Sequence, residues 1–116
     1  LRYVSSVIGR MGAAPRLAAR YGGEEFALML PAEQTDVAHA VLEEIRLEVS
    51  SRALKRRSTN EDLGAITVSS GVAERVPGEP SANLVERADN ALYASKHAGR
   101  NRTTLAEAPP ATAVAA

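Results

Sequence analysis

The sequence predicts an α+β fold, an antiparallel sheet flanked by helices, on three observations. Residues 1–11, 35–54 and 81–98 place apolar side chains at helical spacing. Two short strand-like runs are joined by Gly22-Gly23, which is typical of a tight hairpin because both residues can take positive φ. Residues 65–73 alternate with the period of two that strands show. Antiparallel strands with helices on one face form an α+β sandwich.

The first half of the chain is expected to hold a helix, the hairpin and a long second helix. The first helix covers residues 1–11 and stops at Gly12, a common residue after a helix end. The hairpin strands cover 16–21 and 25–30. In the second strand apolar side chains occupy both faces, so we expect both faces to be covered. The long helix carries an apolar residue every four positions, at Val37, Val41, Ile45 and Val49.

The second half continues with the strand at 65–73 and a third helix. Pro77 to Pro80 reads as a turn, Ser81 is a plausible N-cap, and Gly99 closes the helix. A last short strand covers 101–105. The domain is therefore expected to span residues 1–105, and residues 106–116, rich in Ala, Pro and Thr, form a disordered tail.

Composition excludes several classes of function. The 116 residues contain no Cys, which excludes disulfides and thiolate zinc sites and favours a cytoplasmic location. Lys plus Arg and Asp plus Glu both number 14, so net charge gives no reason to expect a nucleic-acid partner or direct membrane contact. Aromatic residues make up 3%, too few for base-stacking platforms. An upstream domain could still tether the intact parent protein to a membrane.

The stretch from Arg20 to Phe26, Arg-Tyr-Gly-Gly-Glu-Glu-Phe, carries the chemistry. Glycines at a hairpin tip let the backbone approach a bulky anion such as a triphosphate, and a carboxylate beside them can hold a divalent cation. Successive strand residues point to opposite faces, so Glu24 and Glu25 cannot share one role. Taken alone, the stretch is better explained as a structural hairpin with two solvated glutamates.

Four stretches in order resemble the motifs of GGDEF-family diguanylate cyclases, with Gly-Gly-Glu-Glu-Phe as an accepted variant of the signature. The resemblance covers residues 1 to about 105 and is carried by residues 20–31, 1–4, 66–73 and 88–101. It implies a ferredoxin-like or polymerase-palm-like nucleotidyl cyclase fold. It also implies an activity: two GTP molecules are joined into cyclic di-GMP in bacterial signalling, and pyrophosphate is released.

The resemblance assigns roles to individual residues. Glu24 matches the acid that binds Mg²⁺ or Mn²⁺ and is proposed to deprotonate the attacking 3′-hydroxyl. Glu25 matches the second catalytic acid, to which the resemblance assigns no defined part, and Gly22 and Gly23 match the turn beside the nucleotide. Lys96 and Arg100 match cations that contact GTP phosphates; without the family they would read as cations favouring a helix C-terminus. The family also implies a homodimer and an N-terminal sensor or regulatory domain.

The chain is expected to be the C-terminal portion of such a domain. The family's preceding segment supplies a central strand, a further metal-binding Asp, and the Asn and Asp that read guanine. Without them we expect the 116-residue chain alone to be inactive. The alternative is a degenerate or truncated module that binds nucleotide or a partner protein without turnover.

Two further interpretations concern cationic residues. Family members that are inhibited by cyclic di-GMP bind it through an Arg-x-x-Asp pair, which would fall at positions 13 and 16. This chain has Ala13 and Arg16, so no inhibitory site is expected. The basic run Arg52–Arg57 reads as a solvated helix face, with a partner or an anion as the less favoured reading.

Overall fold

The computed structural model describes residues 2–58 and 66–108, and side chains within these ranges except those of 53–58. The helices are α1 (Arg2–Met11), α2 (Thr35–Ser58) and α3 (Ser81–His97). The strands are β1 (Leu17–Gly22), β2 (Glu25–Met29), β3 (Ser70–Val72) and β4 (Thr103–Leu105). The helices and the hairpin expected from the sequence are thus confirmed, and so is the α+β class.

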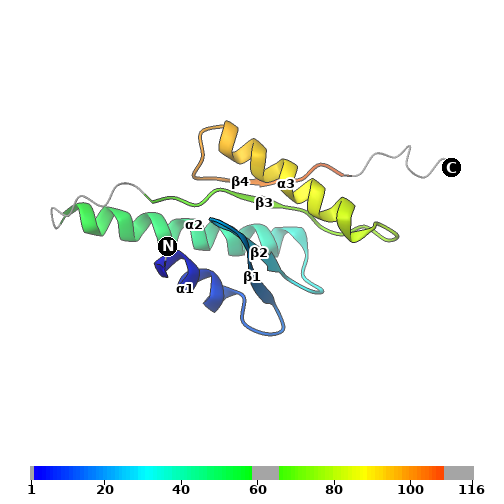
Figure 1. Cartoon of the computed structure of the whole chain (residues 1–116), viewed down its shortest axis with the longest axis horizontal. Coiled ribbons are helices and arrows are strands. Elements are labelled where there is room, and N and C mark those ends of the chain that lie inside the picture. Colours follow the sequence, from blue (N-terminus) through cyan, green and yellow to red (C-terminus); the bar gives the residue numbers. More distant parts are fainter. Residues whose placement is uncertain (1, 59–65, 109–116) are drawn as a thin grey trace.

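Within the described residues, the strands form two separate two-stranded sheets. β1 and β2 pair antiparallel, as expected for a hairpin, whereas β3 and β4 pair parallel. The prediction of antiparallel pairing throughout was therefore wrong for the second sheet. α3 covers one side of the β3–β4 sheet, and α2 runs along the other (Figure 1).

The strand expected at 65–73 is shorter than its alternating pattern suggested. Of the described residues 66–73, only Ser70 to Val72 pair with β4, and residue 65 lies outside the part of the chain that the structure describes. A backbone bond from Ser70 N to the Arg102 carbonyl and one from Ala106 N to the Val72 carbonyl extend this pairing at either end. Ala106, which the sequence placed in the tail, is therefore attached to the sheet. Residues 109–116 of the expected tail lie outside the described residues.

The main core lies between α1, α2 and the inner face of the hairpin. Its buried residues are Val4, Val7, Ile8, Val41, Ile45 and Val49. Phe26, Leu28 and Leu30 pack against this core from the hairpin side. The opposite face of the hairpin is open, because Leu17 and Met29 are 56% and 58% exposed. The expectation that both faces of the second strand are covered was therefore wrong at Met29.

A second packing centre joins α3 to the β3–β4 sheet through a hydroxyl network. Ser95 is fully buried, and its hydroxyl donates to the Ser70 carbonyl at 2.7 Å. The Ser95 hydroxyl also lies 2.6 Å from that of Thr104. A buried hydroxyl is costly without partners, so these contacts explain how a polar residue is accommodated there.

The start of α3 is held by a buried glutamate rather than by a side-chain cap. Pro80 occupies the N-cap position and makes no side-chain hydrogen bond, so the expectation that Ser81 caps the helix was wrong. Glu79 is 6% exposed and accepts hydrogen bonds from Arg87 Nε and Nη2, both at 2.8 Å. Arg87 also donates to the Glu74 and Glu107 carbonyls, so it ties the turn, the helix and the end of β4 together.

Within the described ranges, no helix combines the length and the apolar character that crossing a membrane requires.

Candidate active site

The tip of the β1–β2 hairpin lies one residue further along than the sequence suggested. Gly22 ends β1 and pairs with Glu25, so the two turn residues are Gly23 and Glu24, not Gly22 and Gly23. The register shifts between Arg20 and Gly22, which leaves Tyr21 as the extra residue of a β-bulge. Glu24 therefore stands in the turn itself rather than on the following strand.

Local chemistry explains the shape of this turn. Gly23 has φ +45°, a left-handed conformation that glycine adopts without steric cost. The Arg20 guanidinium donates to the Gly23 carbonyl from Nε at 3.2 Å and from Nη2 at 2.8 Å. Arg20 was not singled out from the sequence, because only the folded hairpin brings its side chain back over the tip.

The tip is open to a ligand. A Cβ added at Gly22 or Gly23 would meet no atom of the chain within 4 Å. Glu24 is exposed, and none of the ion pairs between described residues involves it. The fold thus leaves a carboxylate and two glycine backbones available on one projecting turn.

Lys96 reaches the hairpin from the last turn of α3. Its Nζ lies 3.7 Å from Glu25 Oε1, so the structure brings together two residues that are far apart in the sequence. Both side chains are substantially exposed, and such a pair contributes little to stability. Its importance is positional, because it places an ammonium beside the tip. Glu24 and Glu25 accordingly have different surroundings, but the reason is that Glu24 lies in the turn, not the alternation of strand residues that the sequence suggested.

Arg100 follows α3 in a left-handed turn, with φ +62°. Its amide donates to the Ser95 carbonyl, which closes the end of the helix. The residue is exposed and lies four positions after Lys96. The structure thus places both predicted phosphate-binding cations at the end of α3.

The donor set at the tip suits a hard cation only in part. Carboxylate oxygens are ligands that Mg²⁺ accepts, and Mg²⁺ often binds one or two carboxylates together with substrate phosphates. Glu24 offers one such group. Among the described residues, no three His, Cys, Asp or Glu side chains gather closely enough to hold a metal by themselves. A metal here would therefore need phosphate oxygens as further ligands.

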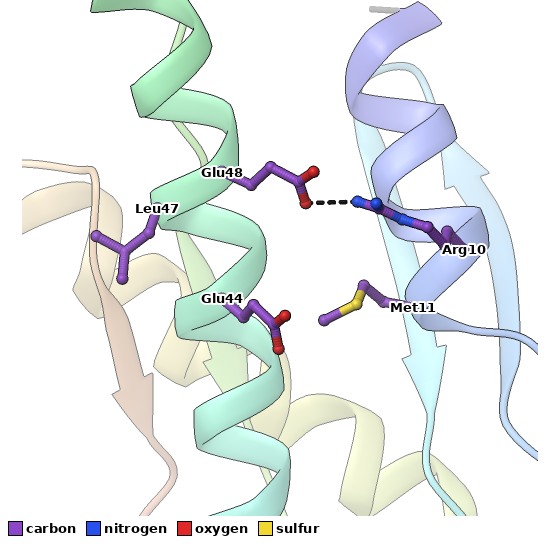
Figure 2. A pocket seen from close by; sticks show the side chains of 5 residues that line it. All are labelled: Arg10, Met11, Glu44, Leu47 and Glu48. Carbon is purple, nitrogen blue, oxygen red and sulfur yellow. Dashed lines mark hydrogen bonds and ion pairs between the residues drawn. The ribbon is translucent and has the colours of Figure 1, made fainter.

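A hollow on the described surface lies away from the hairpin tip. It opens between α1 and α2, where Arg10 and Glu48 form an ion pair at 2.5 Å beside Met11 and Glu44 (Figure 2). None of the residues predicted to act in catalysis lines it. The candidate site is thus a projecting turn with cations beside it, not a preformed cavity.

Arg16 is engaged within the chain. Its Nε and Nη2 donate to the two carboxylate oxygens of Glu33, both at 2.7 Å, and Nη1 donates to the Met11 carbonyl at 3.1 Å. The hydrogen bond from Arg16 lowers the pKa of Glu33, which keeps the pair ionised. Sequence reasoning did not identify Glu33 as the partner of Arg16.

Within the basic run Arg52–Arg57 at the end of α2, the structure describes the side chain of Arg52 alone. The Arg52 guanidinium stacks over the Tyr3 ring at 4.0 Å from its centroid, a cation–π contact between α2 and α1. Arg52 thus contributes to helix packing, in contrast to the solvated face expected. The side chains of the remaining residues of the run lie outside those described.

A network around Glu43 links α2 to β4. Glu43 accepts two hydrogen bonds from Arg46, at 2.8 and 2.9 Å, and a third from Thr103 Oγ1 at 2.8 Å. The hydrogen bonds from Arg46 lower the pKa of the Glu43 carboxyl to about 2, against a smaller opposing effect of burial. Because this pKa lies below its usual value, ionised Glu43 stabilises the folded state.

We expect this stabilisation to be complete above pH 4.5 and to disappear as the pH falls toward 2. After allowance for solvent screening, Glu43→Gln should cost on the order of 2 kcal/mol at pH 7. The variant should also lose less stability than the wild type between pH 5 and pH 2. Urea unfolding at several pH values measures both. A constant difference between the two proteins across that range would show that the carboxylate charge contributes nothing.

The fold and this site define the class: an α+β domain that presents a carboxylate on a glycine-containing hairpin, with cations beside it. The chain belongs to the GGDEF family, because the family model described as diguanylate cyclase, GGDEF domain, matches residues 1–102. This confirms the resemblance carried by the four sequence motifs.

Several relatives are named diguanylate cyclases. The chain is 41% identical over 85 residues to diguanylate cyclase VdcA of Vibrio cholerae, covering 73% of the chain and 25% of the relative. It is 43% identical over 91 residues to diguanylate cyclase A of Treponema denticola, covering 78% of the chain and 24% of the relative. The chain therefore spans about a quarter of the length of these proteins.

Similarity to solved structures agrees with membership of the GGDEF family. The crystal structure of the GGDEF domain of DgcB from Caulobacter crescentus, in complex with c-di-GMP, matches with a TM-score of 0.84 and 70% identity. The match covers 92% of this chain and 63% of the crystallised DgcB domain. The active GGEEF domain of a Vibrio cholerae diguanylate cyclase shares the fold at 24% identity, with a TM-score of 0.78 over 94% of this chain and 67% of that domain.

Proposed function

We propose that the protein containing this chain is a diguanylate cyclase that joins two GTP molecules into cyclic di-GMP and releases pyrophosphate. The observation that carries the proposal is the open hairpin tip, where Glu24 is exposed while Lys96 reaches Glu25 from α3. A free carboxylate with cations beside it is what positioning and charge stabilisation of a triphosphate require. Membership of the GGDEF family and the names of the relatives support the same reaction.

Each residue of the site has a proposed part. Lys96, as a compact point charge, and Arg100, as a planar fork, bind the phosphate oxygens of GTP. The glycine backbones of the tip leave room for the nucleotide to lie against the turn. Glu24 would hold Mg²⁺ or Mn²⁺ together with the phosphates and would accept the proton of the attacking 3′-hydroxyl. When bound, the metal neutralises charge on the phosphates.

Glu25 is proposed to act through Lys96. The 3.7 Å separation of their charged atoms would keep the ammonium near the tip until phosphate arrives. This gives the second acid of the motif a part distinct from that of Glu24, which the sequence left undefined.

The reaction requires a second copy of the domain. Among the described residues, one hairpin tip presents one carboxylate outside any ion pair, that of Glu24, and each domain is proposed to hold one GTP. Two copies facing each other antiparallel would bring each 3′-hydroxyl to the other molecule's phosphate. A homodimer is therefore the proposed active form.

We further propose that it works in the cytoplasm and that an N-terminal sensor or regulatory domain controls its assembly. The related enzyme SiaD of Pseudomonas aeruginosa, crystallised with its activator SiaC, is a precedent for control by a partner.

Chromatography of GTP incubated with the full-length protein and Mg²⁺ or Mn²⁺ tests the proposal. Cyclic di-GMP and pyrophosphate are expected as products. The 116-residue chain assayed in parallel should make neither, because a single carboxylate holds Mg²⁺ poorly. GTP binding without product under any metal condition would favour the alternative, a binding module without turnover.

We also propose that the product does not regulate the protein through positions 13 and 16. Arg16 stands where the resemblance would place an Asp, and Glu33 and the Met11 carbonyl already occupy its guanidinium. Ala13 offers no cation. The guanine of cyclic di-GMP would thus meet neither a carboxylate acceptor nor a free arginine at this place.

Calorimetry with cyclic di-GMP on full-length Glu24→Gln, with and without Arg16→Ala, is the measurement. Arg16→Ala should leave the product affinity unchanged, within about twofold. The related DgcB domain was crystallised with c-di-GMP, so binding elsewhere is compatible with this proposal. Submicromolar binding that disappears in Arg16→Ala would contradict it.

A further inference from the structure

The turn after α3 has an unusual backbone. Gly99, Arg100 and Asn101 follow one another with φ of +121°, +62° and +50°. Residues with a Cβ rarely adopt positive φ, and two in succession persist only where their surroundings fix them. Asn tolerates this conformation better than most residues, whereas Arg has no such preference. Something outside the turn must therefore hold Arg100 in place.

Asn101 supplies contacts that can do so. Its backbone N–H donates to Ser69 Oγ at 3.1 Å. Its side-chain Oδ1 accepts a hydrogen bond from Arg46 Nη1 at 3.3 Å. Ser69 precedes β3 and Arg46 belongs to α2, so two separate segments converge on one residue.

Arg46 is itself rigidly placed. Its other two nitrogens, Nε and Nη2, donate to the Glu43 carboxylate at 2.8 and 2.9 Å, and Glu43 also accepts a hydrogen bond from the Thr103 hydroxyl. A planar guanidinium that is hydrogen-bonded through two of its nitrogens presents the third nitrogen in a fixed direction. The Glu43–Arg46 pair therefore connects α2 to the turn through the hydrogen bond from Arg46 to Asn101.

The backbone of Arg100 is fixed while its guanidinium is left free. Its amide donates to the Ser95 carbonyl at 2.9 Å, and its carbonyl accepts from Arg102 Nε at 3.1 Å. In the described part of the chain, no hydrogen bond or ion pair uses the Arg100 side chain. A held backbone with an unengaged charged end is the arrangement that a preorganised anion-binding group needs.

We propose that Asn101 is a positioning residue for binding of the nucleoside triphosphate, acting through Arg100. The Arg46–Asn101 contact holds the left-handed turn, and the turn aims the Arg100 guanidinium at the triphosphate beside Lys96. The inference rests on the proposed function, because it requires Arg100 to contact nucleotide.

The test compares Asn101→Gly with wild type in the full-length protein. Glycine accepts positive φ, so this change removes the Arg46 contact without adding backbone strain. Binding of 3′-deoxy-GTP with Mg²⁺, which lacks the attacking hydroxyl, is measured by calorimetry. We expect Asn101→Gly to weaken binding about three- to tenfold, the effect of losing one hydrogen bond to a charged group. Arg46→Lys keeps a charge beside Glu43 but loses the fork, and it should act in the same direction.

Dependence on Arg100 separates positioning from a merely structural role. In an Arg100→Ala background, Asn101→Gly should cause no further loss, because residues that act as a unit are not additive. Arg10→Ala, which breaks the exposed pair with Glu48 on α1 and α2, is the matched control and should leave affinity unchanged.

An equal loss from Asn101→Gly in both backgrounds, or no loss at all, overturns the inference while leaving the proposed function standing. Failure of the wild type to bind the analogue removes both.

Discussion

Replacing Gly71 by alanine is expected to destabilise the domain by about 3 kcal/mol or more, because overpacking against backbone cannot be relieved by a side-chain rotation. A Cβ at this position would lie 2.3 Å from the Ala88 carbonyl oxygen and 2.3 Å from the Leu92 nitrogen. Both atoms belong to the backbone of α3, so the whole helix would have to move away from β3. Thermal unfolding of the full-length protein, followed by circular dichroism, measures the change.

Gly9→Ala is the matched control for this prediction. Gly9 lies in α1, and a Cβ there would meet nothing within 4 Å. Alanine also favours a helix over glycine by roughly 1 kcal/mol, so this variant should be neutral or slightly more stable. If Gly71→Ala melts at the wild-type temperature, α3 does not pack on β3 as closely as the structure has it.

The packing at Gly71 also bears on the site, because α3 carries Lys96 to the hairpin. Lys96 meets Glu25 only while α3 stays against the β3–β4 sheet. We therefore expect Gly71→Ala to weaken nucleotide binding as well as stability, even though Gly71 makes no contact with the site.

Local patterns predicted most of the elements, and their failures have a common cause. The helix periodicity predicted α2 and its apolar face, on which Val41, Ile45 and Val49 are buried in the core whereas Val37 is 41% exposed. The direction of the β3–β4 pairing was not predictable in this way, because alternation fixes the faces of a strand but not its partner. The turn residues were misplaced by one, because a bulge at Tyr21 shifts the hairpin register.

At the candidate site too, some features were predictable from the sequence and others were not. The family resemblance predicted Glu24, Glu25 and Lys96 as site residues, and the structure adds that Glu25 lies beside Lys96. Sequence reasoning could not identify Arg20, Glu33 or the Arg46–Asn101 contact, because these depend on side chains that meet only in the folded chain. Arg46 and Asn101 are 55 positions apart, and nothing in either neighbourhood signals the other.

Glu24→Gln is expected to reduce cyclic di-GMP formation by the full-length protein by about 10²- to 10⁴-fold, the range for loss of one essential acid–base group. Glutamine keeps the size of the side chain but neither binds a hard cation as strongly nor accepts a proton from a hydroxyl. Glu24 is exposed in the turn and makes no ion pair among the described residues, so folding should be unaffected. Chromatographic rates and thermal unfolding of the same preparations separate the two effects.

Glu25→Gln is the matched control, because it makes the same chemical change at the neighbouring residue. It removes only the exposed pair with Lys96, and we expect a loss of roughly tenfold or less, since exposed pairs contribute about 1 kcal/mol at most. Turnover by Glu24→Gln at the wild-type rate would remove Glu24 from catalysis. Equal losses in the two variants would instead mean that both carboxylates hold the metal, and that the contact between Glu25 and Lys96 gives way when nucleotide binds.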